Sequence, residues 1–275
     1  MRVMLVPVAD RPECARALNS AFDLGNRLGA SVTGCHIRPH RYSDTSLGSE
    51  FAQAAWRKKS SKRAPVAAKA LYKSIAEEHG YKLMRRASEE PRAHWFERVG
   101  SPSKIMGIVG PMSDLIVVSR PTQPDGVATM FLKSALFHGG RPVLILPQRT
   151  RRRVGRRICI GWDQGPRVAR VVTASIPLLQ QADEVTIVTC GPEDRPGPKS
   201  AHLQEYFARW GIEATHVTTR GRHVERELMD TCQATKADLL VTGAYTRSRW
   251  YEKVLGGTTE FLIHKARLPV LMQHD

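Results

Sequence analysis

The chain has 275 residues, of which 41% are hydrophobic, and this length and composition suit two domains of ordinary size with apolar cores. Its formal net charge of +16 is compatible with nucleic acid, acidic surfaces or anionic small molecules as partners. No apolar run approaches the roughly 20 residues that span a bilayer, and Pro7 and Asp10 interrupt the N-terminus too early for a secretory signal. We therefore expect a cytoplasmic protein without a membrane partner.

The cysteines are odd in number, scattered, and without any Cys-x-x-Cys pairing. This pattern argues against both a disulfide framework and a zinc site. We expect reduced, mostly buried thiols and no bound metal among them. The five are Cys14, Cys35, Cys159, Cys190 and Cys232.

Four short apolar segments occur twice in the same order, which indicates a tandem repeat of one domain. The pairs are RVMLVPVAD at Arg2 with RICIGWDQG at Arg157, ASVTGCHIRP at Ala30 with DEVTIVTCGP at Asp183, SDLIVVSRP at Ser113 with ADLLVTGAY at Ala237, and GRPVLILPQ at Gly140 with ARLPVLMQH at Ala266. We predict domains at residues 1–148 and 156–275. The seam, Pro147–Arg157, is rich in arginine and suits an exposed linker.

The repeated apolar runs are rich in Val, Ile and Leu without polar alternation, as in strands buried on both faces of a parallel sheet. Residues of helical spacing lie between them in the second repeat: Val168, Val171, Val172, Leu178 and Leu179, and then Val224, Leu228 and Cys232. We predict an α/β fold with two tandem Rossmann-like domains, each a five-stranded parallel sheet flanked by helices. The first repeat also carries an insertion, residues 41–92, whose basic, polar sequence predicts a surface helix.

Ligands of open parallel sheets bind outside the carboxyl ends of the strands, where the order of strands reverses. In the second repeat Asp163 directly follows the first strand. Its carboxylate could accept hydrogen bonds from an adenine amine or from ribose hydroxyls, or it could cap the next helix. The sequence leaves both readings open.

The fourth strand of the second repeat leads into a glycine-rich loop, TGAYTRSRWYEKVLGGTTEFL. Glycines let backbone N–H groups approach a polyphosphate, and the start of the helix that follows adds donors and a favourable dipole. A plain strand-to-helix connection capped by Thr258 is the alternative. The candidate ligands in this loop are Gly243, Thr246, Arg247, Gly256, Gly257, Thr258 and Thr259.

The order of elements, Asp163 and this loop resemble the universal stress protein family. Its nucleotide-binding members carry a Gly-x2-Gly-x9-Gly-[Ser/Thr] loop before the last helix and strand. Gly243 and Gly256 match the first and third glycines, while Thr246 replaces the second and Gly257 replaces the Ser or Thr. The resemblance covers both halves, and it implies an adenine nucleotide alpha hydrolase-like fold in each.

The resemblance also implies roles for particular residues. Asp163 would face adenine and ribose, and Thr259 would supply a further hydroxyl. Independently of the resemblance, the charge of Arg247 and its place in the loop allow it to contact phosphates. The implied ligand is ATP, with or without Mg²⁺. The two halves would form an intramolecular pseudo-dimer, and the whole chain could form a homodimer.

The first repeat has a different loop. Arg120 and Pro121 stand where the second repeat has the region of Gly243, and the glycine pair at residues 139–140 comes too late to open a helix. Asp10 keeps the carboxylate after the first strand. We predict that the first domain does not bind ATP in the usual manner and mainly completes the pseudo-dimer.

No catalytic residues can be identified, because P-loop, zinc-protease and serine-hydrolase motifs are all absent and the ten histidines are dispersed. We expect a non-enzymatic stress-response or regulatory protein that binds ATP or a related adenine nucleotide, with slow hydrolysis at most. The alternative is a nucleotide-free scaffold whose basic surface binds an acidic protein or nucleic acid. An ATP-consuming enzyme is a third reading, for which no base can be named.

Overall fold

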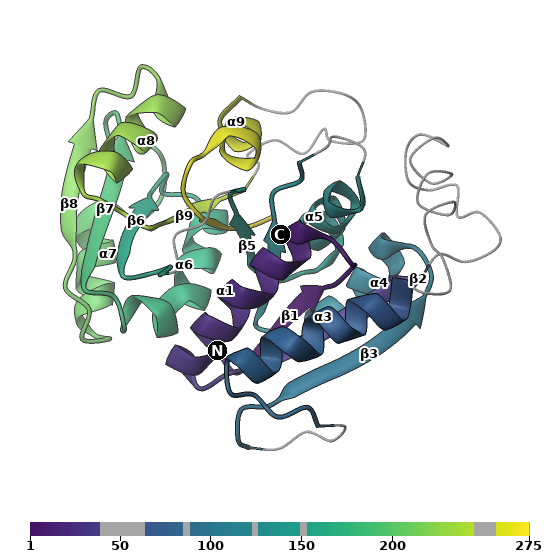
Figure 1. The fold of residues 1–275 in the computed structure, drawn as a ribbon. Helices are drawn as coiled ribbons and strands as arrows, with labels where there is room; N and C mark the ends of the chain where they lie inside the picture. Colours follow the sequence, from purple (N-terminus) through teal and green to yellow (C-terminus); the bar gives the residue numbers. More distant parts are fainter. Residues whose placement is uncertain (39–63, 85–88, 123–125, 149–152, 245–256, 275) are drawn as a thin grey trace. The chain divides into compact units, whose positions relative to one another are not determined.

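The computed structural model describes residues 1–38, 64–84, 89–122, 126–148, 153–244 and 257–274 (Figure 1). The chain divides into two compact units, Met1–Gln148 and Arg149–Asp275. Within the described ranges, no helix is both long and apolar enough to cross a bilayer.

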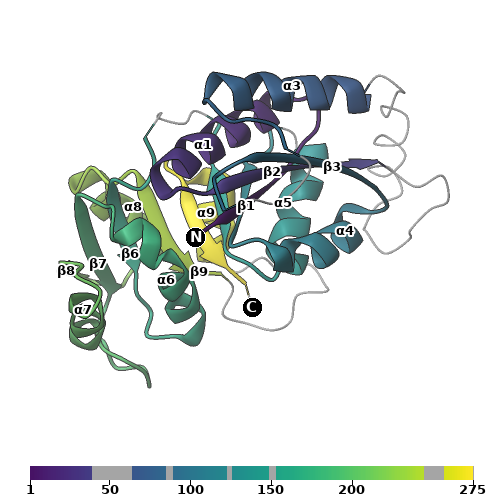
Figure 2. The ribbon, with the colours of Figure 1, turned by 90° about the horizontal axis from the view of Figure 1, so that it is seen from below.

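The first unit is a five-stranded parallel sheet in the order β3-β2-β1-β4-β5. Its elements are β1 (Val3–Pro7), α1 (Pro12–Leu28), β2 (Ser31–Arg38), α3 (Ala64–Glu78), β3 (Ala93–Val99), α4 (Pro102–Val109), the short 3-10 helix η1 (Gly110–Met112), β4 (Leu115–Ser119), α5 (Val127–His138) and β5 (Val143–Leu146). Helices α1 and α3 pack on one face of this sheet, and α4 and α5 pack on the other (Figure 2).

Helix α3 is the described part of the predicted basic insertion, and it is a surface helix on one side only. Its apolar stripe packs against α1 and β2, and Tyr72 is fully buried. The Tyr72 hydroxyl donates to the carbonyl of Val32 (2.7 Å), which satisfies the phenol inside the core. This stripe therefore belongs to the core of the first unit.

The second unit repeats the same architecture, with parallel strands in the order β10-β9-β6-β7-β8. Its elements are β6 (Arg157–Gly161), α6 (Pro166–Leu179), β7 (Glu184–Cys190), α7 (Ser200–Ala208), β8 (Thr215–Thr219), α8 (Val224–Ala234), β9 (Leu239–Gly243), α9 (Gly257–Lys265) and β10 (Val270–Gln273). The predicted α/β fold with two Rossmann-like domains, each a five-stranded parallel sheet, is confirmed.

The spacing of apolar residues predicted α6 correctly. All five of its predicted apolar residues are buried, and the helix packs against β9 and β10. The cysteines are all free, and all except the partly exposed Cys190 are buried, in agreement with the prediction.

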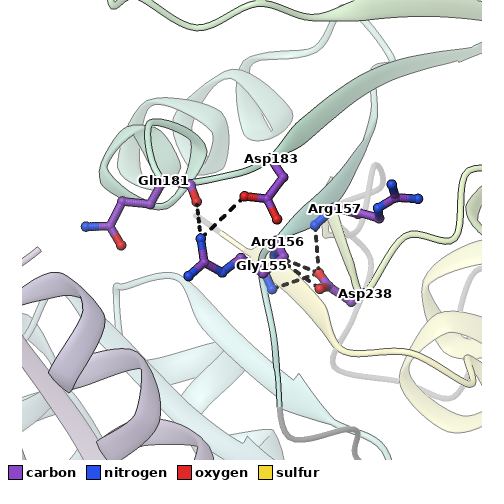
Figure 3. Close-up of polar contacts among 6 residues, drawn as sticks. All are labelled: Gly155, Arg156, Arg157, Gln181, Asp183 and Asp238. Carbon is purple, nitrogen blue, oxygen red and sulfur yellow. Dashed lines mark hydrogen bonds and ion pairs between the residues drawn. The ribbon is translucent and has the colours of Figure 1, made fainter.

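One carboxylate in each unit ties the start of the first strand to the start of the fourth. In the second unit Asp238, just before β9, accepts backbone hydrogen bonds from Gly155, Arg156 and Arg157 at 2.8 to 3.1 Å (Figure 3). In the first unit Asp114 accepts from the backbone N–H groups of residues 2–3 in the same way. Asp238 thus satisfies backbone donors that lie just before β6 and at its first residue.

A second carboxylate, Glu227, fixes the turn between β8 and α8. It accepts hydrogen bonds from the backbone N–H groups of Gly221 (2.7 Å), Arg222 (2.8 Å) and His223 (3.0 Å), and from the hydroxyl of Thr219. The backbone bond from His223, the Thr219 hydroxyl and the bond from Gly221 lower the pKa of Glu227 to about 2.

The Glu227→Gln variant should therefore be less stable than wild type, by an amount that depends on pH. Because the folded pKa lies below the unfolded value of about 4.3, ionised Glu227 stabilises the fold above that value. The contribution is lost as pH falls towards 2. We expect the melting temperatures of the two proteins to differ most near neutral pH and to converge between pH 4.5 and 2. A constant difference across this range would show that the charge of Glu227 is not what stabilises the turn.

Candidate functional site

The candidate site lies in the second unit, at the carboxyl edge of its sheet. From β6 the chain continues to β7 and β8 on one side and then returns to β9 and β10 on the other. Strands β6 and β9 are therefore neighbours at the point where the strand order reverses, with Gly161 of β6 paired to Thr242 of β9. Open parallel sheets bind their ligands at such a point.

Asp163 follows β6 at this point and forms part of the turn into α6. Its Oδ1 accepts a hydrogen bond from the backbone N–H of Gly165, the N-cap residue of α6, at 2.9 Å. Its Oδ2 lies 3.8 Å from Nη1 of Arg195, and 38% of the Asp163 side chain is exposed. One oxygen thus has the turn-forming role that the sequence allowed, while the other forms a long, exposed ion pair among the residues that the structure describes.

Gly243 ends β9 beside the first turn of α6. A Cβ at this position would lie 3.0 Å from the backbone nitrogen of Val168 and 3.3 Å from Cβ of Arg167. The close approach of strand and helix is itself a reason for glycine here. Gly243 therefore brings the end of β9 next to the turn that holds Asp163.

The other predicted ligands are only partly covered by the structure. Thr246, Arg247 and Gly256 lie outside the described residues. Helix α9 begins at Gly257, so the backbones of residues 257–259, including Thr258 and Thr259, form its first turn. The first N–H groups of a helix have no partner within it, and they favour an anion.

The loop after β7, residues 191–199, covers the turn after β6. The indole N–H of Trp162 donates to the carbonyl of Pro198 (2.9 Å), and Trp162 is only 5% exposed. The side-chain oxygen of Gln164 accepts from the backbone N–H of Arg195 (3.1 Å). Gly197 packs so tightly that a Cβ there would lie 2.2 Å from the carbonyl oxygen of Gln164.

Sequence reasoning missed this loop and two polar residues at the site, Gln164 in the turn after β6 and Arg195 in the loop. Gln164 is buried, and its backbone lies in the left-handed region (φ 63°). Its Nε2 has no hydrogen-bond partner in the described part of the chain. Arg195 places a cation next to Asp163. The sequence feature that could have indicated this loop is GPEDRPGP, which directly follows the second strand of the repeat, at the edge where ligands bind.

The corresponding edge of the first unit is different. Arg120 follows β4 and is buried, and burial lowers the pKa of its guanidinium to about 10, so it stays charged at neutral pH. Thr122, two residues later, donates a hydrogen bond to Glu13 in the first turn of α1. Asp10 is exposed. Ser119 thus ends β4 where Gly243 ends β9, and the buried cation Arg120 follows where the second unit has Ala244.

The fold and the switch point place both units in the class of Rossmann-like α/β domains. Residues 173–274 match the model of the universal stress protein family. This match confirms the resemblance inferred for the second repeat, and Asp163 lies before the matched residues. A search of curated proteins finds no significant match.

Solved structures share the fold over the whole chain. A universal stress protein from Archaeoglobus fulgidus has a TM-score of 0.70 at 14% identity, with 99% of this chain and 98% of that chain covered. A functionally unknown protein from Pseudomonas aeruginosa PAO1 has a TM-score of 0.55 at 15% identity, with 100% and 92% covered. The cytoplasmic domain of a prokaryotic cation chloride cotransporter has a TM-score of 0.53 at 13% identity, with 100% and 95% covered. These likenesses extend the fold to the first unit.

Proposed function

We propose that the second unit binds ATP or a related adenine nucleotide and that the protein acts in a stress response as a regulator. The observation that carries this proposal is the state of Asp163 at the switch point between β6 and β9. One of its oxygens accepts the hydrogen bond of the turn, and the other forms a 3.8 Å ion pair with Arg195 among the described residues, with 38% of the side chain exposed. That oxygen can accept from the amine of adenine or from a ribose hydroxyl.

The phosphates would lie towards the start of α9. The first turn of this helix, Gly257 to Thr259, offers backbone donors that suit a polyphosphate, and Gly243 lets β9 approach the first turn of α6. From the sequence we add Thr246, Arg247 and Gly256 to this proposal. Bound ATP would supply the negative charge, with or without Mg²⁺, that these donors and cations neutralise.

We further propose that hydrolysis is slow or absent. Efficient hydrolysis needs a base or a positioned group that activates water beside the phosphates. In this proposal Asp163 faces adenine and ribose, and the groups proposed to face the phosphates are glycines, threonines and Arg247, none of which is a general base at neutral pH. The nucleotide would then act by biasing conformation or the choice of a protein partner.

The first unit would not bind nucleotide in this way. Its fourth strand ends in Ser119 where the second unit has Gly243, and the buried, charged Arg120 comes next. A nucleotide would have to displace this side chain or be contacted by it through a different geometry. The expected stoichiometry is therefore one nucleotide per chain.

Mass spectrometry of the purified protein after mild denaturation should detect co-purified adenine nucleotide. Calorimetric titration of the nucleotide-free protein with ATP should then give one saturable site per chain, with negligible phosphate release over hours. Absence of nucleotide together with no saturation at millimolar ATP would contradict the proposal. It would favour the nucleotide-free scaffold, for which salt-sensitive binding to an acidic polypeptide or to RNA would be the positive result.

A further inference from the structure

A cavity of about 910 Å³ lies in the second unit between α8 and α9. The two helices are neighbours (Figure 1). The cavity runs along α8 from His223 to the residues before β9, and its other walls come from the second half of α9 and the residues before β10. None of Asp163, Arg195 and Gly243 lines it, so it is separate from the candidate nucleotide site. Small-molecule sites have volumes of roughly 300 to 1,000 Å³.

The charged groups that line the cavity are unbalanced. Its cations are Arg153, Arg226, Lys236, Lys265 and Arg267, and its carboxylates are Glu225, Asp230 and Asp238. Five cations thus face three carboxylates, and Asp238 already accepts hydrogen bonds from the backbone of residues 155–157 (Figure 3). None of the ion pairs between described residues involves these five cations. An anion would be attracted to such a lining.

The remaining wall is apolar, with Met229, Phe261, Leu268 and Pro269 among its residues. A cationic lining next to apolar side chains suits a ligand that has both an anionic group and an apolar body. Lys236 adds a conformational observation. It follows α8 in the left-handed region (φ 54°), where glycine is favoured, yet the chain places a cavity-lining lysine there.

We propose that this cavity binds a small organic anion with a hydrocarbon or aromatic body, such as a carboxylate or a sulfonate. Arg226 and Arg267 pair with its anionic group, and Met229 and Phe261 contact its body. This site is additional to the nucleotide site and does not depend on it. The protein would then respond to two ligands of different chemistry in one unit.

The probe for the test is 8-anilinonaphthalene-1-sulfonate, titrated into the full-length protein by fluorescence and calorimetry. We expect one saturable site per chain. Decanoate should displace the probe at least about tenfold better than decanol, which lacks the charge, or inorganic phosphate, which lacks the body. ATP should not displace it. Equal displacement by decanol and decanoate, or displacement by ATP, would overturn the proposal.

Variants of the full-length protein locate the site. Met229→Trp should fill the cavity and remove saturable probe binding, and the double variant Arg226→Glu/Arg267→Glu should weaken it at least about tenfold. The matched control is Arg209→Glu, a charge reversal at an exposed arginine that does not line the cavity, and it should retain wild-type affinity. Thermal melts check the folding of each variant. If Met229→Trp fails to fold, the exposed Arg226 and Arg267 decide the outcome, and unchanged affinity in their double variant contradicts the proposal.

Discussion

Replacing Gly197 with alanine should weaken adenine nucleotide binding by at least about tenfold while both units remain folded. Gly197 has φ 144°, a region that residues with a Cβ rarely adopt. Its added Cβ would lie 2.2 Å from the carbonyl oxygen of Gln164 and 3.2 Å from the carbonyl carbon. Backbone cannot yield as a flexible side chain can, so the loop after β7 must move away from the turn that holds Asp163.

The displacement of the loop should also change the tryptophan fluorescence of the protein. Arg195 and Pro198 flank Gly197, and they contact Asp163 and Trp162 respectively. Tryptophan emission should shift to the red as Trp162 becomes exposed, and the shift should be absent in a Trp162→Phe background.

The matched control for this prediction is Gly211→Ala. Gly211 also has positive φ (68°) and lies in the same unit, but its added Cβ would meet no described residue other than its chain neighbours within 4 Å. The Gly211→Ala variant should lose some stability and keep the nucleotide affinity and the emission spectrum of wild type. Equal nucleotide affinity in Gly197→Ala and wild type, with the emission shift present, would exclude the loop from the site.

Replacing Asp238 with alanine should lower the free energy of unfolding of the second unit by about 2 to 4 kcal/mol. The carboxylate accepts from three consecutive backbone N–H groups, and its removal leaves these part-buried donors unsatisfied. It also loosens the segment that leads into β6, the strand that positions Asp163. Urea unfolding monitored by circular dichroism measures the change.

The control for this prediction is Asp183→Ala. Asp183 makes one long bond (3.4 Å) to the exposed guanidinium of Arg156, so its loss should cost no more than about 1 kcal/mol (Figure 3). The same change at Asp114 should destabilise the first unit, because it accepts the corresponding N–H groups there. Similar losses for Asp238→Ala and Asp183→Ala would contradict the anchoring role.

Much of the fold followed from short-range patterns. Uninterrupted apolar runs predict strands buried on both faces, and the spacing of Val168, Val171 and Val172 predicts one buried side of α6. The repeat then extends the prediction to both units. The carboxyl-edge position of Asp163 follows from the same pattern, because parallel strands bring their carboxyl ends to one edge of the sheet.

The interactions that complete the site could not be predicted in this way. Arg195 reaches Asp163 only because Gly197 and Pro198 fold the loop after β7 back over β6, and no local periodicity encodes that contact. Asp238 was visible as an aspartate shared by both repeats, but its partners lie more than 80 positions earlier in the chain.

The most direct test of the central claim is an ATP titration of wild type, Asp163→Ala, Asp163→Asn and Asp10→Ala. The asparagine can still accept from the N–H of Gly165, so it separates loss of the turn from loss of charge. Both Asp163 variants should bind about 10- to 100-fold more weakly, the equivalent of roughly 1.5 to 3 kcal/mol for a hydrogen bond to a charged group. Asp10→Ala, which removes the carboxylate after the first strand of the first unit, should bind as wild type does. Wild-type affinity in both Asp163 variants, or an equal loss in Asp10→Ala, would contradict a nucleotide site built on Asp163.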